Sequence, residues 1–247
     1  MTDNVTSIAD NITQVRSEIA AACARGGRSV DAVTLIAVSK THPREDVIVA
    51  AQAGITHFGE NRVEESESKI PAVNAALDAR PTWHMIGHIQ SRKARSVLPL
   101  FDVAHSVDSL KLAEKLARQA EEMDRTFDVF LEVNVSGEEA KEGLDGVGWE
   151  DSADVRAVLW PICQQILALP GLTVRGLMTM APYESEPEET RPVFRSLARL
   201  RDALRADLGA SLPDLSMGMT NDYPIAIEEG ATLVRVGRAI FGERSVR

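Results

Sequence analysis

Lys40 is the residue of this chain whose position points most directly to chemistry. It follows an apolar, β-branched run over residues 33–38, which predicts a buried strand. An ammonium group is costly to bury at the mouth of such a strand, and a desolvated lysine loses its proton easily and can form a Schiff base with an aldehyde. A lysine just beyond a strand end can equally extend its charged group into water. This segment alone leaves both interpretations open.

Two glycine-containing loops near the end of the chain are typical of anion binding. The first, residues 217–222, contains Gly218 and Thr220, and the second, residues 235–238, contains Gly237. Glycine lets the backbone approach a ligand closely, and backbone N–H groups that face a ligand bind anions. Each glycine alone is also compatible with an ordinary turn.

Composition limits the partners of such a site. The 247 residues carry a net charge of −10, from 37 acidic and 27 basic side chains. This charge disfavours non-specific binding to nucleic acid or anionic membrane, so local donors must hold an anionic ligand. The start of the chain lacks the pattern of a signal peptide, and no apolar run approaches the ~20 residues of a membrane span. We expect a cytoplasmic protein.

We expect no metal site. Cys23 and Cys163 fall in separate predicted helices and form no CxxC pair. His84 and His88 have a spacing that suits a metal on a helix, but residues 83–87 are typical of a strand, where that geometry is wrong.

Helical and strand patterns alternate along the whole chain. Residues 3–25 have a helical period, which Gly26 and Gly27 end. Strands are predicted at 33–38, 56–59, 82–87, 101–106, 127–133, 173–180, 214–219 and 232–237. Helices are predicted between them at 44–53, 61–78, 90–98, 108–123, 152–168, 187–208 and 222–229.

This alternation predicts a parallel sheet with right-handed crossovers, and the length suits a closed (β/α)8 TIM barrel. An open doubly wound sheet is the competing architecture, but no Gly-x-Gly-x-x-Gly turn follows the first strand. We predict a single domain over residues 1–247, with a helix and lead-in at 1–32 and the barrel at 33–243. The polar loop 134–151 is either a lid over the site or a solvated loop.

In a barrel, the two glycine loops follow strands seven and eight, where phosphate groups are typically held. A phosphate site facing a reactive Lys40 predicts a phosphorylated carbonyl ligand. The residues leave two candidates open. One is a class I aldolase acting on a sugar phosphate, and the other is a protein that holds pyridoxal 5′-phosphate (PLP).

Six motifs resemble the pyridoxal phosphate homeostasis protein family, in the family's order. They lie at residues 37–40 (AVSK), 58–61 (FGEN), 83–90 (WHMIGHIQ), 175–178 (RGLM), 215–219 (LSMGM) and 234–242 (VRVGRAIFG). The resemblance implies the barrel of the alanine racemase N-terminal domain, a covalent aldimine of PLP at Lys40, and Asn61 near that lysine. It implies that Arg235 faces the pyridine nitrogen, and that the remaining cofactor-binding residues are His84, Ser216, Met217, Thr220, Gly237 and Arg238.

Three positions depart from common family patterns. Arg92 stands where asparagine is frequent, Thr220 where serine is usual, and Arg238 where threonine or serine is common. Thr220 keeps the hydroxyl group. At Arg238 the side-chain contact to phosphate is in doubt, whereas the backbone contact is unaffected.

The resemblance also bears on catalysis. An arginine opposite the pyridine nitrogen discourages its protonation and makes a weak electron sink; an ion pair with a nearby acid is the alternative role of Arg235. Racemisation needs two bases, and alanine racemases take the second from a partner's C-terminal β-domain, whereas this chain ends at Arg247. We therefore expect a monomeric PLP carrier or buffer in vitamin B6 homeostasis that passes PLP to apoenzymes. The alternative is a PLP-dependent amino-acid racemase whose second base is His84 or Tyr183.

Overall fold

The structure is a computed structural model that describes residues 2–138, 142–182 and 185–243. Within these residues, eight parallel strands close into a barrel, because β1 pairs with β9 and β4 with β5. The strands are β1 (Thr34–Val38), β2 (His57–Glu60), β3 (Thr82–Met85), β4 (Val103–Val107), β5 (Phe127–Asn134), β7 (Leu172–Met178), β8 (Asp214–Met219) and β9 (Leu233–Val236). The predicted (β/α)8 barrel is confirmed.

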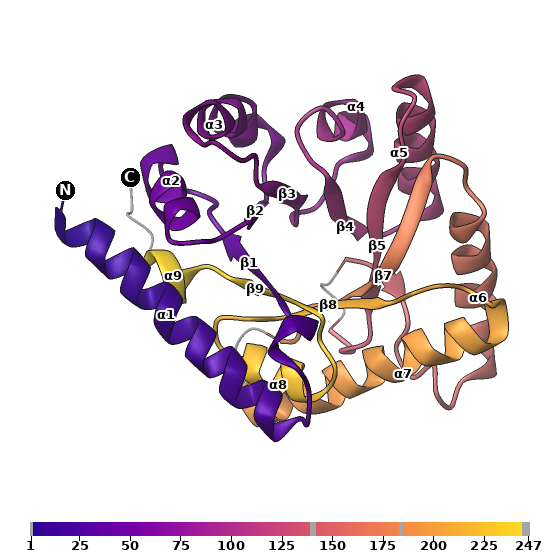
Figure 1. The fold of residues 1–247 in the computed structure, drawn as a ribbon. Helices are drawn as coiled ribbons and strands as arrows, with labels where there is room; N and C mark the ends of the chain where they lie inside the picture. Colours follow the sequence, from indigo (N-terminus) through magenta and orange to yellow (C-terminus); the bar gives the residue numbers. More distant parts are fainter. Residues whose placement is uncertain (1, 139–141, 183–184, 244–247) are drawn as a thin grey trace.

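Helices lie outside the strands and connect them (Figure 1). The α-helices are α1 (Thr2–Arg25), α2 (Arg44–Gln52), α3 (Val63–Ala76), α4 (Ala94–Val97), α5 (Leu110–Glu122), α6 (Ala153–Leu167), α7 (Arg191–Leu208), α8 (Tyr223–Glu228) and α9 (Arg238–Phe241). Short 3-10 turns occur at η1 (Val30–Ala32), η2 (Ser91–Lys93) and η3 (Pro187–Thr190). No helix in the described part of the chain is long and apolar enough to cross a membrane.

Several segments differ from the sequence-based expectation, and the short helix α9 follows β9 where no helix was predicted. The predicted helix 90–98 divides into η2 and α4, and the predicted helix 187–208 divides into η3 and α7. Prolines stand in the first turns of η3 and α7, where their missing N–H and fixed φ favour a helix start. The loop 134–151 also contains a short strand, β6 (Leu144–Asp145), which pairs with β5.

The protein has two apolar layers of very different size. The larger one lies between the strands and the surrounding helices and includes Phe58, Trp83 and Phe194. The smaller one contains only Ile36, Val103, Phe130, Met178 and Leu233 with Met180 at its edge. Several buried polar residues sit among the strands as well, namely His84, His105, Ser216, Glu132 and Arg235. Polar groups that are this deeply buried require hydrogen-bond partners.

The N-terminal helix α1 covers the seam where the barrel closes. The helical period predicted a buried face, and its members Ile8, Ile12, Val15, Ile19 and Ala22 are buried. It contacts α2, α8 and α9 (Figure 1). The helix therefore joins the first and last elements of the barrel.

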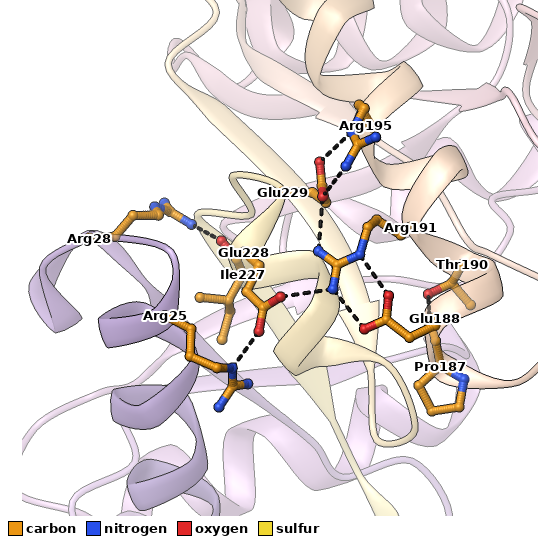
Figure 2. Close-up of polar contacts among 10 residues, drawn as sticks. All are labelled: Arg25, Arg28, Pro187, Glu188, Thr190, Arg191, Arg195, Ile227, Glu228 and Glu229. Atoms are coloured by element: carbon orange, nitrogen blue, oxygen red, sulfur yellow. Dashed lines mark hydrogen bonds and ion pairs between the residues drawn. The ribbon is translucent and has the colours of Figure 1, made fainter.

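A network of arginines and glutamates fastens α1 and α7 to α8 (Figure 2). Arg191 at the start of α7 donates to Glu188, Glu228 and Glu229 over 2.7–2.9 Å. Glu228 also accepts from Arg25 of α1 at 2.6 Å. Glu188 is 70% exposed, whereas Arg191, Glu228 and Glu229 are only 23%, 16% and 13% exposed. The pairs of Arg191 with Glu228 and Glu229 are therefore less screened than ordinary surface pairs.

We expect Arg191→Met to lower the free energy of unfolding by about 1–2 kcal/mol, because two largely buried glutamates lose a partner. Arg199→Met is the matched control on the same helix. Arg199 pairs only with Glu150 in the described contacts and is 61% exposed, so its loss should cost less than about 0.5 kcal/mol. Urea unfolding of the three proteins measures the difference, and equal stabilities of the two variants would contradict the network's role.

Candidate functional site

A cavity of about 650 Å³ opens at the carboxyl ends of the strands. Six of the predicted site residues line it, namely Lys40, Asn61, Thr220, Arg235, Gly237 and Arg238. They come from the ends of β1, β2, β8 and β9, which the sequence separates widely but barrel closure brings together. This is the end of a (β/α)8 barrel at which ligands are bound.

A tight turn after β1 sets the position of Lys40. The next residue, Thr41, has a φ of 68°, which is unusual for a residue other than glycine. Its N–H donates to Glu65 at 2.8 Å, and the hydroxyl of the preceding Ser39 donates to Glu60 at 2.7 Å. Side chains from β2 and α3 thus hold both residues that flank the lysine.

A buried ion pair supports this turn. Lys69 of α3 is 7% exposed and donates to Glu60 at 3.0 Å, to Glu65 at 2.5 Å and to the carbonyl of Ser39 at 3.1 Å. Burial raises the pKa of Glu60, against the effect of the nearby Lys69. Sequence reasoning missed the role of Lys69, because two of its partners, Ser39 and Glu60, lie outside α3.

Close backbone packing shapes the opposite side of the cavity. Gly218 has a φ of +92°, and a Cβ atom there would lie 2.6 Å from the Cβ of Ala226. A Cβ atom at Gly237 would lie 3.2 Å from the carbonyl oxygen of Val38. Glycine at these positions therefore lets the ends of β8 and β9 pack tightly beside α8 and β1. The Arg238 side chain donates to Asn221 at 3.0 Å.

Arg235 is a buried cation in the lining of the cavity, with 5% of its surface exposed. Its guanidinium donates to the carbonyl and hydroxyl oxygens of Ser216 at 2.8 and 2.6 Å and to the carbonyl of Thr179 at 3.0 Å. Burial lowers its pKa to about 10, while Asp222 and Glu132 oppose that shift. The side chain is therefore charged at neutral pH, and its recorded hydrogen bonds go to neutral oxygens.

Glu132 at the end of β5 also lines the cavity, although sequence reasoning did not single it out. It is 4% exposed. Burial raises the pKa of its carboxyl group to about 7, against the opposing charge of Arg235. A buried acid that titrates near neutral pH is typical of functional sites. Its signal in the sequence is a charged residue inside an otherwise apolar strand.

Three predicted residues lie outside the cavity lining. Ser216 is buried and hydrogen-bonded to Arg235, and Met217 packs in the apolar layer between strands and helices. His84 lies in β3, as predicted for a strand residue, and its two ring nitrogens face His57 and His105. Tyr183, the other candidate base, lies outside the described residues.

Part of the loop 134–151 reaches the cavity. Glu142 lines it and pairs with His88 at 2.7 Å. Residues 139–141 lie outside the described chain. In the ranges that the structure describes, no group of three or more histidine, cysteine or acidic side chains has the arrangement to hold a metal ion.

Comparisons with known proteins find relatives over nearly the whole chain. The sequence matches the family described as alanine racemase, N-terminal domain, over residues 5–245. The pyridoxal phosphate homeostasis protein of Aquifex aeolicus is 38% identical over 235 residues, which are 95% of this chain and 97% of that protein. The protein of the same name from Pseudomonas aeruginosa is 41% identical over 241 residues, 97% of each chain.

A solved structure extends the comparison to the fold. The structure of PipY of Synechococcus elongatus with PLP bound superposes with a TM-score of 0.81 at 37% identity, covering 95% of this chain and 100% of that chain. The family match and these relatives span nearly the whole sequence. The chain therefore belongs to the pyridoxal phosphate homeostasis protein family, which shares the barrel of the alanine racemase N-terminal domain.

Proposed function

We propose that this protein holds PLP through a Schiff base on Lys40 and serves as a cytoplasmic carrier or buffer of PLP rather than as a catalyst. The observation that carries the proposal is the position of Lys40, which lines one cavity together with Arg235 and Gly237. The relatives named as homeostasis proteins and the PLP-bound PipY support it. In this role a monomer would keep the concentration of free PLP low, because its aldehyde is reactive, and would pass PLP to apoenzymes.

The residues present fit PLP. Lys40 supplies the amine for its aldehyde, and the hydroxyl of Thr220 with the backbone of Gly237 and Arg238 suits its phosphate. Within the described contacts, the buried Oδ1 atom of Asn61 has no hydrogen-bond partner. Because a buried acceptor without a partner is costly, a ligand that donates a hydrogen bond there would stabilise the site.

Arg235 disfavours PLP reactions that need a strong electron sink, so it suits either a carrier or racemase-type proton transfer. When bound, PLP supplies an electron sink whose strength depends on protonation of its ring nitrogen. A guanidinium that stays charged at neutral pH donates to that nitrogen and disfavours its protonation. Arg235 is held in place by Ser216 and Thr179. It can therefore orient the pyridine ring of PLP without strengthening its electron sink.

One observation favours a second candidate, a PLP-dependent amino-acid racemase. Glu132 lines the cavity with a pKa of about 7, so it can both accept and donate a proton near neutral pH. His84 is a poor candidate for this task, because both of its ring nitrogens are occupied by hydrogen bonds away from the cavity.

The proposed covalent link is tested on Lys40. The untreated protein should be yellow, and borohydride should fix a pyridoxyl group on Lys40 that peptide mass spectrometry locates. We expect Lys40→Ala to bind PLP at least about tenfold more weakly, because the covalent bond is lost. The matched control is Lys111→Ala on the exposed face of α5, which should bind like the parent. Equal affinity of Lys40→Ala and the parent would overturn the assignment.

Catalysis is tested by proton exchange. The PLP-loaded protein is incubated with L-amino acids in deuterated water, and loss of the α-proton is followed by NMR. A carrier should show no exchange above that of free PLP. Exchange at a useful turnover that disappears in Glu132→Gln would favour the racemase instead.

The ionisation of Glu132 should also affect the free energy of unfolding of the protein without any ligand. Its pKa in the folded protein is about 7, above its ordinary value of 4.5. Between these values the folded state binds more protons than the unfolded state, so this group lowers stability as pH rises through that window. We expect Glu132→Gln to be more stable than the parent by about 1–3 kcal/mol above neutral pH and nearly equal to it in acid.

Urea unfolding across this pH range measures the effect. Glu121→Gln on the exposed part of α5 is the control, and it should change stability little at any pH. A Glu132→Gln difference that does not depend on pH would contradict the raised pKa.

A further inference from the structure

A continuous column of hydrogen bonds crosses the strands from Arg235 to the opposite end of the barrel. Ser216 Oγ lies 2.8 Å from His105 Nδ1, His105 Nε2 lies 2.8 Å from His84 Nδ1, and His84 Nε2 lies 2.9 Å from His57 Nδ1. Ser216, His105 and His84 are 0–2% exposed. His57 is half-buried and is the first residue of β2, at the amino-terminal end of the barrel.

The donors and acceptors of the column can be assigned from Arg235 outward. A guanidinium only donates, so Ser216 Oγ accepts from Arg235 and its own hydrogen points to His105 Nδ1. A neutral imidazole has one N–H, so His105 carries its hydrogen on Nε2 and donates to His84. By the same rule His84 donates to His57, and every bond of the column points away from the cavity.

The opposite direction is disfavoured. If His105 Nδ1 donated to Ser216, the hydroxyl oxygen would accept from both His105 and Arg235. The recorded hydrogen bonds of the described residues offer the serine hydrogen no other acceptor, and a buried donor without a partner is costly. A single direction is therefore built into the column by the charge of Arg235.

The inner histidines remain neutral over the physiological pH range. Burial lowers the pKa of His84 to about 3, and the neighbouring His57 adds to the shift. Burial also lowers the pKa of His105 well below its ordinary value, with smaller contributions from His84 and Arg235. Neutral rings are what a chain of alternating donors and acceptors requires.

We propose that His105 and His84 are positioning residues that hold Arg235 through Ser216, and that the column couples a proton on His57 to the PLP-binding cavity. The coupling to PLP rests on the proposed function. His57 accepts from His84 while it is neutral. When His57 gains a second proton, its Nδ1 becomes a donor, and each hydrogen bond between His57 and Ser216 must reverse or break. Ser216 then faces two donors, which loosens its hold on Arg235.

The surroundings of His57 shift this protonation to more acidic solution than for an ordinary histidine. Burial lowers its pKa below 6.5, and the carboxylate of Asp102 acts in the opposite direction. Asp102 is itself paired with Arg80 at 2.9 Å. Asp128 in β5 interacts with Arg175, Asp214 and Arg125. His84 is the imidazole that faces His57 from β3.

The direction of the column is tested first on the apo parent protein. Long-range ¹H–¹⁵N NMR of the imidazole rings should show both His84 and His105 protonated at Nε2 and bare at Nδ1 at neutral pH, with neither ring titrating as His57 does. A Nδ1–H tautomer at either ring would overturn the assigned direction. This result does not depend on whether PLP binds.

The coupling is tested by PLP affinity from neutral pH down to the acidic pH at which the same NMR spectra show the His57 ring protonated. His57→Gln keeps an acceptor for His84 but cannot gain a proton. We expect the parent to lose about threefold to tenfold more affinity over this range than His57→Gln. His57→Phe removes the acceptor, so it should bind more weakly than His57→Gln at neutral pH.

Two further variants separate the column from general effects on the barrel. Ser216→Ala is introduced both alone and together with His57→Gln. The two proteins should lose PLP affinity equally in acid, because without the Ser216 hydroxyl the column no longer reaches Arg235. Thr232→Val is the control, since Thr232 bonds to Asp214 and Leu215 and not to the column. In the Thr232→Val background, adding His57→Gln should still reduce the loss of PLP affinity in acid. Identical acid profiles of the parent and His57→Gln would overturn the coupling. Absence of PLP binding in the parent would instead refute the proposed function.

Discussion

The arrangement of this site depends on keeping one guanidinium charged inside a barrel. Transferring a charge from water to a buried position is costly unless hydrogen bonds and opposite charges compensate for it. Arg235 receives both, because Ser216 and Thr179 supply oxygens and the carboxylates of Glu132 and Asp222 lie near enough to favour its charged form. This requirement explains why the strands enclose so many polar side chains and why the apolar cluster with Phe130 is small.

The two sides of the cavity are built by different physical means. Around Lys40, a buried ion pair of Lys69 with Glu60 ties the end of β1 to β2 and α3. Across from it, the loops after β8 and β9 come close because Gly218 and Gly237 carry no Cβ atom. Polar contacts thus position the turn that carries Lys40. Close backbone packing on the other side leaves backbone N–H groups where the proposed phosphate would lie.

Arg235 also links the site to the rest of the barrel. Because it only donates, it orients Ser216 and, through that hydroxyl, the two buried imidazoles behind it. Chains of hydrogen bonds in a low-dielectric interior strengthen one another. A change at one end, such as a proton on His57, is therefore transmitted further than in water. The same cation therefore both lines the cavity and orders the interior of the barrel.

The sequence by itself determined the order and type of the elements, because apolar periodicity and glycine punctuation are local signals. It also located Lys40 and the two loops, since strand ends in a barrel converge on one face. The sequence did not reveal Glu132, the support from Lys69 or the histidine column. Their roles depend on partners from distant strands and on burial, which shifts a pKa only after the barrel has closed. Tertiary structure alone decided those features, because hydrogen-bond partners and desolvation are properties of the packed chain.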